Sequence, residues 1–198
     1  MSLASYKQKR NFNQTSEPEG KIVSSKKKLA FVIQRHKATR LHYDFRLEMD
    51  GVLKSWAVPR GPSMNPADKR LAMMVEDHPY DYRTFEGTIP AGNYGAGIVE
   101  IWDQGTYTPV DEKHNLITEK AILQNLEKGN IKFSIQGKKL KGEWALVKMK
   151  TAENNSWLLI KHKDEYATSE PYDSEKLTPA SSLINKELKK VVSAKTKE

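Results

Sequence analysis

The feature that most constrains the fold is a two-residue alternation of hydrophobic and polar side chains, broken by glycine and proline, that recurs through the middle of the chain. A period of two places successive side chains on opposite faces of a β-strand. Eight segments follow this pattern or form short apolar runs: 30–34, 41–48, 52–58, 71–76, 97–102, 131–135, 143–149 and 157–162. The sequence therefore predicts a mainly β protein with short connections.

The connections carry hairpin and helix signals. Asp50 and Gly51 predict a two-residue turn between the second and third segments, of the type in which both residues have positive φ. Residues 136–142 predict a second hairpin. One helix is expected between Thr118, which can cap it, and Gly129, which can end it. Its apolar face would consist of Ala121, Ile122 and Leu126. Eight short strands and one helix predict an antiparallel barrel or sandwich.

Composition changes at both ends of the chain. Residues 1–28 lack hydrophobic periodicity and combine lysine and arginine with aromatic residues, which predicts a mobile basic arm. From about residue 163 the chain is charged and contains scattered serine and proline, so a helix near its end would be marginal. We therefore predict an arm at 1–28, a packed β domain at 29–163 and a charged tail at 164–198.

Charge and cysteine content limit the function. The net charge of +8 favours polyanionic partners such as nucleic acid. The absence of cysteine excludes disulfides, Cys-ligated zinc, iron–sulfur clusters and thiol nucleophiles, so a metal would have to bind through His, Asp or Glu. Because no stretch approaches the ~18 apolar residues of a membrane span, we expect no membrane association and a soluble, cytoplasmic protein.

The segment from Arg35 to Gly51 concentrates metal-binding and phosphate-binding side chains. In a strand, His42, Asp44 and Arg46 share one face, opposite the apolar face formed by Leu41, Tyr43, Phe45 and Leu47. His42 and Asp44 would lie about 6.6 Å apart at Cα, close enough for both tips to reach one ion. His36, across a short turn, offers a third ligand, and Arg46 could hold a phosphate beside the metal.

Three other interpretations compete with this one. His-x-Asp on a strand can be a solvated hydrogen-bonding face. Two histidines and an aspartate are also the ligand set of non-haem Fe(II) oxygenases, in which Arg46 would bind a 2-oxoacid carboxylate. Finally, the protein could be a nucleic-acid-binding module without catalysis. Oxygen uptake with 2-oxoglutarate would favour the oxygenase, and duplex binding without turnover would favour the binding module.

Two further segments have both structural and functional interpretations. His78 precedes a proline and follows a hydrophobic strand, so it is either a turn residue or part of a site that also includes Tyr82. Residues 90–97 are glycine-rich but lack the Gly-Lys-Ser/Thr of a P-loop, and they predict a turn between strands. His114 and His162 have no comparable neighbours and receive no role.

Several long segments together resemble a known family. They are "FVIQRHKATRLHYDFRLEMDGVLKSWAVPRGPS", "EDHPYDYRTFEGTIPAGNYGAG", "IWDQGTY" and "KLKGEWALVKM…WLLIKHKDEYA". In this order they resemble the 3′-phosphoesterase domain of bacterial DNA ligase D, which also occurs as a free-standing protein. The likeness extends from about residue 6 to residue 167. It implies a small antiparallel β-barrel of about eight strands with one or two flanking helices, which agrees with the strand count.

The resemblance also implies an activity. Members of this family are Mn²⁺-dependent phosphodiesterases and phosphomonoesterases that act at the 3′ end of a DNA primer carrying ribonucleotides. They remove a terminal ribonucleoside and then the remaining 3′-phosphate, which restores the 3′-hydroxyl for sealing during non-homologous end joining. The chain has no Lys-x-Asp-Gly adenylation motif and thus no evident ligase activity of its own, so a separate DNA ligase is a candidate partner.

Matching positions give each residue an expected role. The metal ligands would be His36, His42 and Asp44. The scissile phosphate would contact Arg46 and His78, with Tyr82 completing the pocket. Supporting polar residues are matched by Gln34, Arg70 and Glu76. Arg10 and Glu17 fit the family's "KR-x-F…T-x-EP" segment, although Asn11 stands where an acidic residue is usual. A protonated His78 would serve as the general acid, since its ordinary pKa lies near neutral pH.

Overall fold

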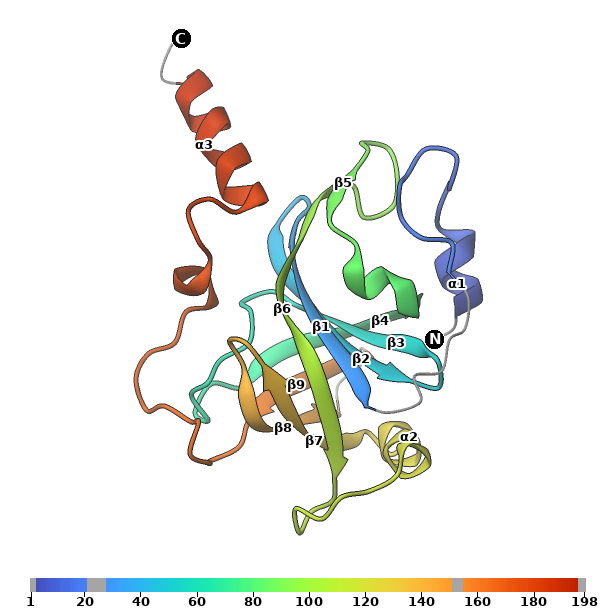
Figure 1. Cartoon of the computed structure of the whole chain (residues 1–198), viewed down its shortest axis with the longest axis vertical. Coiled ribbons are helices and arrows are strands. Elements are labelled where there is room, and N and C mark those ends of the chain that lie inside the picture. Colours follow the sequence, from blue (N-terminus) through green and yellow to red (C-terminus); the bar gives the residue numbers. More distant parts are fainter. Residues whose placement is uncertain (1–2, 21–27, 151–154, 196–198) are drawn as a thin grey trace.

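The protein is described by a computed structural model that covers residues 3–20, 28–150 and 155–195 (Figure 1). It contains nine strands: β1 Leu29–Lys37, β2 Leu41–Met49, β3 Val52–Val58, β4 Arg70–Pro79, β5 Gly87–Ile89, β6 Gly97–Val110, β7 Asn130–Gly137, β8 Lys141–Lys148 and β9 Ser156–Lys161. The helices are α1 Leu3–Gln8, α2 Glu119–Glu127 and α3 Leu183–Lys195, with 3₁₀ turns η1 Tyr80–Thr84 and η2 Ser174–Leu177.

Eight of the strands close into an antiparallel barrel. The order is β1-β2-β3-β4-β9-β8-β7-β6, and pairing of β6 with β1 completes the ring. The predicted β-barrel and all eight predicted strands are confirmed. The ninth strand, β5, adds to the outer end of β6. The sequence analysis missed β5 because three residues are too few to show an alternation, and it ended β6 too early.

β6 continues through a glycine, Gly105, that is paired on both sides. Gly105 pairs with Phe31 of β1 on one side and with Gly137 of β7 on the other. A Cβ atom built on Gly105 would lie 2.1 Å from the carbonyl oxygen of Gln136. Glycine therefore allows the close approach of two strands at this point, three residues beyond the predicted end of the strand at residue 102.

The predicted hairpin and helix are present. Asp50 and Gly51 have φ values of 53° and 72°, as a two-residue turn of this type requires. The Thr118 side chain accepts a hydrogen bond from the Ala121 amide at the start of α2, and Gly129 follows the helix with φ 81°. The α-helices number three in the described residues, rather than the one or two expected.

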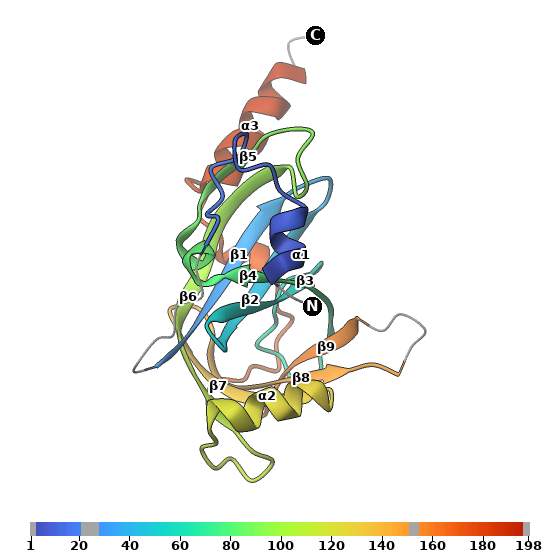
Figure 2. The ribbon, with the colours of Figure 1, turned by 90° about the vertical axis from the view of Figure 1, so that its right-hand side faces the viewer.

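Two hydrophobic clusters lie on opposite faces of the barrel wall. The interior cluster includes Phe45 and all four tryptophans, each at most 3% exposed. The second cluster joins Val32 of β1 and Leu53 of β3 to Tyr6, Tyr82, Phe85, Ile89 and Val99. Phe31 and Ile33 belong to the interior cluster, whereas Val32 between them belongs to the second, as strand alternation requires. The second cluster therefore fastens α1, η1 and β5 to the outside of the barrel (Figure 2).

The described parts of both terminal segments pack against this barrel. Tyr6 of α1 is fully buried, so residues 3–20 do not form the mobile arm that was expected. At the other end, Arg35 of β1 is bonded to Glu100, Glu175 and Asn185, which ties η2 and the start of α3 to the barrel. The rest of α3 projects away from the barrel (Figure 1). The domain boundaries at residues 28 and 163 stay a prediction.

Within the described residues, no helix combines the length and apolarity that crossing a membrane would require.

Candidate active site

A cavity of about 250 Å³ lies on the outer face of the barrel, beside β1, β2 and β4. Its walls come from the strand face that carries His42, Asp44 and Arg46, from the N-terminal segment and from the connection between β5 and β6. The lining residues are Arg10, His36, Ala38, His42, Asp44, Arg46, Ala57, Val75, Glu76, His78, Tyr82, Ile89, Tyr94 and Gly95. The structure thus brings together side chains that lie as far apart in sequence as Arg10 and Tyr94.

The pairing of β1 with β2 assembles a group of three potential metal ligands. His36 and His42 are directly opposite one another in this pairing, and Asp44 follows on the same face of β2. One donor atom from each residue lies within 4.8 Å of the others. His36 Nδ1 is 3.5 Å from Asp44 Oδ2, and His42 Nε2 is 3.6 Å from Asp44 Oδ1. The predicted convergence of the three side chains is therefore present.

Hydrogen bonds to backbone carbonyls orient both imidazoles. His36 Nε2 lies 2.9 Å from the Gly95 carbonyl oxygen, and His42 Nδ1 lies 2.9 Å from that of Arg40. A carbonyl can only accept, so these nitrogens carry the ring protons in the neutral form. The other ring nitrogens, His36 Nδ1 and His42 Nε2, then carry a lone pair each, and these are the atoms that lie closest to Asp44. Metal-ligating histidines commonly have this arrangement, in which the second ring nitrogen donates to a carbonyl.

Arg46 connects the three potential ligands to the rest of the cavity. Its Nη2 donates to Asp44 Oδ2 over 3.0 Å, and its Nε donates to Gln34 Oε1 over 2.8 Å. Its Nη1 is buried and has no hydrogen-bond partner within residues 3–20, 28–150 and 155–195. Burial alone would raise the pKa of Asp44, but the Arg46 guanidinium and the two imidazoles hold that pKa well below its usual value. Asp44 is therefore ionised, and Arg46 retains a donor that is not used within the protein.

Gln34 holds the Arg46 guanidinium in place by accepting a hydrogen bond from it. Its amide nitrogen donates to the carbonyl oxygens of Tyr82 and Phe85, over 3.0 and 2.9 Å. The amide oxygen is thereby turned toward Arg46. The predicted supporting residue thus positions the Arg46 guanidinium without lining the cavity itself.

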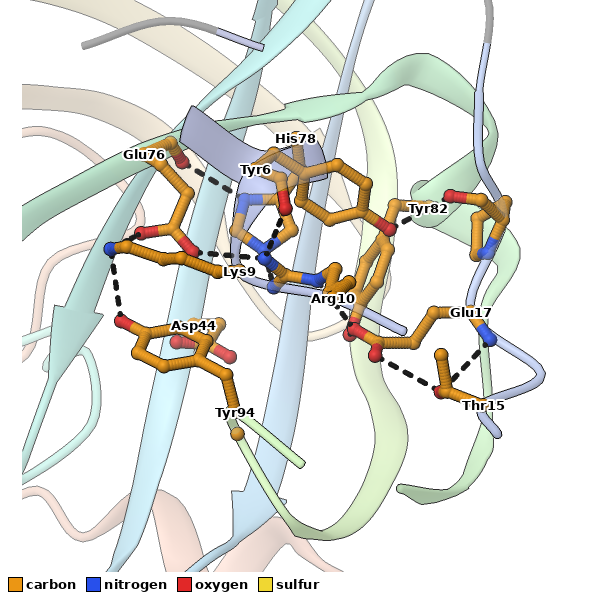
Figure 3. Close-up of polar contacts among 12 residues, drawn as sticks. Tyr6, Lys9, Arg10, Thr15, Glu17, Asp44, Glu76, His78, Tyr82 and Tyr94 are labelled. Carbon is orange, nitrogen blue, oxygen red and sulfur yellow. Dashed lines mark hydrogen bonds and ion pairs between the residues drawn. The ribbon is translucent and has the colours of Figure 1, made fainter. Parts of the chain in front are cut away.

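The N-terminal segment supplies the opposite wall (Figure 3). Arg10 is paired with Glu17 at 3.0 Å and with Glu76 at 3.1 Å, and its Nη2 lies 3.2 Å from His78 Nε2. Lys9 is bonded to the other oxygen of Glu76, also at 3.1 Å. Burial opposes ionisation of Glu76, but hydrogen bonds from the backbone and from these two cations lower its pKa overall. Arg10 and Glu17 are therefore part of the site.

His78 is held in the neutral state in the free protein. Its Nδ1 lies 2.9 Å from the Glu76 carbonyl oxygen, so this nitrogen carries the proton and Nε2 accepts from Arg10. Burial, together with the positive charges of Arg46 and Arg10, lowers the pKa of His78 well below its ordinary value. The expectation of a protonated His78 is corrected, because burial and the two nearby guanidinium groups lower the pKa of the ring.

Tyr82 closes the cavity from η1. Its hydroxyl donates to Glu17 Oε1 over 3.0 Å, and the Arg46 guanidinium carbon lies 4.9 Å from the ring centroid. Burial raises the pKa of Tyr82 far above its ordinary value, so the phenol remains protonated. Tyr82 therefore serves here as a hydrogen-bond donor and as a surface for the guanidinium.

Arg70 is the one predicted site residue that the structure places elsewhere. It begins β4 and bonds to Asp68 and to the Tyr172 carbonyl oxygen. It lines a different depression, with Tyr43, Arg60 and other residues. Position 70 is six residues from Glu76 along β4, and this separation along a strand removes it from the cavity.

The sequence analysis missed several residues of the cavity. The turn predicted at 90–97 is also a wall, because it brings Tyr94 and the Gly95 carbonyl to the ligands. Tyr6 packs beneath Arg10, with its ring centroid 3.8 Å from the guanidinium carbon. The mixture of aromatic and basic residues in the N-terminal segment was a signal for these contacts, but it does not specify where the segment docks.

Comparison with known proteins finds a matching family and several similar curated proteins. The family described as the DNA Ligase D 3'-phosphoesterase domain matches residues 34–148. The chain is 47% identical over 190 residues to the multifunctional non-homologous end joining protein LigD of Pseudomonas aeruginosa, covering 94% of this chain and 22% of that protein. It is 42% identical over 164 residues to the protein of the same name from Mycolicibacterium smegmatis, covering 82% and 21%. The chain thus spans about a fifth of the length of these curated relatives.

Proposed function

The chain belongs to the DNA ligase D 3′-phosphoesterase domain family, and from this premise we propose that it is a metal-dependent phosphoesterase that restores 3′-hydroxyl ends on nucleic acid strands. Its proposed substrates are the 3′ ends of DNA primers that carry a ribonucleotide or a 3′-phosphate, and its proposed context is non-homologous end joining. The observation that carries the proposal is one cavity in which three potential metal ligands adjoin Arg46, whose Nη1 has no hydrogen-bond partner among the residues that the structure describes.

His36, His42 and Asp44 are the residues that would hold the cation, and we propose Mn²⁺. Two neutral imidazoles and one carboxylate suit a divalent transition metal, and three protein ligands leave coordination positions for substrate. When bound, the cation would supply positive charge that polarises the phosphoryl oxygens. The carbonyl contacts of both imidazoles support this role because they already present the lone pairs that a cation needs.

The remaining residues of the cavity would bind and orient the phosphate. Arg46 offers Nη1, and its guanidinium plane is fixed by Gln34 and Asp44. Negative charge spreads over the phosphoryl oxygens in the transition state, so a fixed guanidinium stabilises it without further reorganisation. Arg10, held by Glu17 and Glu76, adds a second positive charge from the opposite wall.

His78 would act as the general acid that protonates the leaving oxygen. In the free protein its Nε2 is an acceptor, bonded to Arg10. A bound phosphate brings negative charge to the same cavity, which opposes the effect of the two guanidinium groups and raises the affinity of Nε2 for a proton. We propose that His78 then donates this proton to the leaving oxygen.

The test uses three primers annealed to a longer template: one ends in a 3′-phosphate, one in a single ribonucleotide and one in a plain 3′-hydroxyl. Each is incubated with the protein in Mn²⁺, Mg²⁺, Zn²⁺ or EDTA, and the products are sized on a gel. The proposal predicts shortening of the ribonucleotide end and loss of the 3′-phosphate with Mn²⁺, no reaction in EDTA and no change in the plain primer. Binding of all three primers without turnover in any metal would instead identify a non-catalytic binding module.

A further inference from the structure

Tyr94 occupies an unusual position for an exposed aromatic residue. Of the large hydrophobic side chains that are exposed in the described part of the chain, it is the one that lines the cavity, and it is 48% exposed. Single exposed hydrophobic residues are ordinary on protein surfaces, so exposure alone means little. Its place at the rim of the cavity, next to the potential metal ligands, is what requires an explanation.

The connection that carries Tyr94 is fixed on both sides of the ring. The Asn93 amide bonds to the Pro90 carbonyl oxygen and the Ala96 amide to that of Asn93, over 3.3 and 3.1 Å. The next residue after Tyr94, Gly95, has φ 76° and accepts the hydrogen bond from His36. The Tyr94 ring is therefore one residue away from the Gly95 carbonyl that orients His36, and this contact sets the position of the ring relative to a potential metal ligand.

Cations from the N-terminal segment flank the same ring. Lys9 Nζ lies 4.6 Å from the Tyr94 ring centroid and 3.5 Å from its hydroxyl, and Glu76 holds the same ammonium group. The Arg10 guanidinium carbon lies 5.5 Å from the centroid. Figure 3 shows the Tyr94 ring below Lys9, to whose ammonium group its hydroxyl is joined. An aromatic face beside positive charges is the combination by which proteins bind single nucleic acid strands, since bases stack and phosphates pair.

We propose that Tyr94 is a stacking platform for the base of the 3′-terminal nucleotide, an inference that rests on the proposed function. The scissile phosphate would lie at Arg46, and the base of the same nucleotide would lie against Tyr94, which lines the same cavity. Stacking tolerates any base because every base has a π-face. Tyr94 would thus select a 3′ end that carries a base, whichever base it is.

The test compares two primers with a 3′-phosphate: one ends in an ordinary nucleotide and the other in a tetrahydrofuran residue that has no base. Tyr94→Ala should lower kcat/KM on the first primer roughly 10- to 100-fold, mainly through KM, because one stacking contact is lost. On the abasic primer, the variant and the unaltered protein should agree within about twofold. Tyr94→Phe, which keeps the ring, should restore most of the lost kcat/KM. Tyr166→Ala is the matched control, since Tyr166 is 41% exposed and does not line the cavity.

Two results would overturn the inference. An equal loss on both primers would show that Tyr94 acts through Lys9 or through its own loop, and no loss on either would show that the ring contacts no base. A binding measurement with 2-aminopurine at the 3′ terminus, in EDTA, separates this inference from the proposed function. A fluorescence change that Tyr94→Ala abolishes would support stacking even if no primer were cleaved, and an unaltered change in that variant would contradict it.

Discussion

The two walls of the cavity are built in different ways. On one wall, His42, Asp44 and Arg46 alternate along β2, and the register with β1 places His36 opposite His42. On the other wall, Arg10 and Glu17 come from a segment that precedes the barrel and is held by buried ion pairs and by α1. The first wall is part of the barrel's hydrogen-bonded ladder, whereas the second is a short segment docked onto its outside.

The two walls should therefore respond differently to substitution. A side chain of β2 cannot leave the first wall without a change of strand register, which would also expose the barrel core. The second wall can be altered while the barrel remains folded, because its contacts lie outside the barrel's hydrogen-bonded ladder and outside the interior cluster. We therefore expect substitutions in the first wall to abolish turnover, and substitutions in the second to change its rate and pH dependence.

The largest effect is expected from Asp44→Asn. This change keeps the size of the side chain but removes the one carboxylate among the three potential ligands. We expect kcat/KM for 3′-phosphate release to fall at least about 1,000-fold, because both the cation and Arg46 lose their negative partner. Activity within tenfold of the unaltered protein would contradict the assignment, provided that near-UV circular dichroism shows an intact fold.

Arg46→Lys should cost somewhat less. Arg46 bonds to Gln34 and Asp44 through different nitrogens, and its Nη1, which has no hydrogen-bond partner among the described residues, would bind the substrate under the proposed function; a single ammonium group cannot reproduce this fork. We expect a roughly 100-fold loss in kcat, measured at saturating primer. Arg83→Lys is the matched control, because Arg83 stacks on Tyr80 and does not line the cavity. Equal activities for the two variants would rule out the fork as a source of transition-state stabilisation.

Arg10→Ala tests the second wall. Burial is the main cause of the low pKa of His78, and the charges of Arg46 and Arg10 add to it. Removing Arg10 should therefore raise that pKa toward its ordinary value, while the barrel stays folded. Titration of the His78 ring protons by NMR measures the shift, with Lys7→Ala as a control on the same segment, since Lys7 does not line the cavity. An unchanged or lowered pKa would contradict the contact between Arg10 and His78.

The smallest effect concerns stability in acid. His78 has a folded-state pKa well below its ordinary value, so below about pH 6.5 the unfolded chain binds a proton that the folded protein does not. The free energy of unfolding should therefore fall as the pH decreases below about 6.5, by up to about 1.4 kcal/mol per pH unit from this group. Urea unfolding of the unaltered protein and of His78→Gln measures the effect. If the free energy of unfolding changes with pH to the same extent in both proteins, the prediction is contradicted.

The same contrast explains what could be predicted from the sequence. The first wall was predictable because a period of two places His42, Asp44 and Arg46 on one strand face, whichever fold the strand joins. An antiparallel barrel or sandwich was predictable from the eight segments, and the family resemblance selected the barrel, although β5 was too short to detect. The second wall was identified only through family resemblance. Nothing in the local pattern of Arg10 indicates that it docks beside His78, because such docking depends on long-range packing of Tyr6 in a cluster outside the barrel.

Binding of Mn²⁺, followed by electron paramagnetic resonance as the ion is titrated into the protein, tests the central claim most directly. The unaltered chain should bind one ion tightly, and His42→Ala should lose that binding without unfolding. His114→Ala is the matched control, since His114 is an exposed histidine that pairs with Glu143 and does not line the cavity, and it should bind as the unaltered protein does. If His42→Ala binds the ion with unchanged stoichiometry and affinity, the three side chains at the cavity are not the metal site.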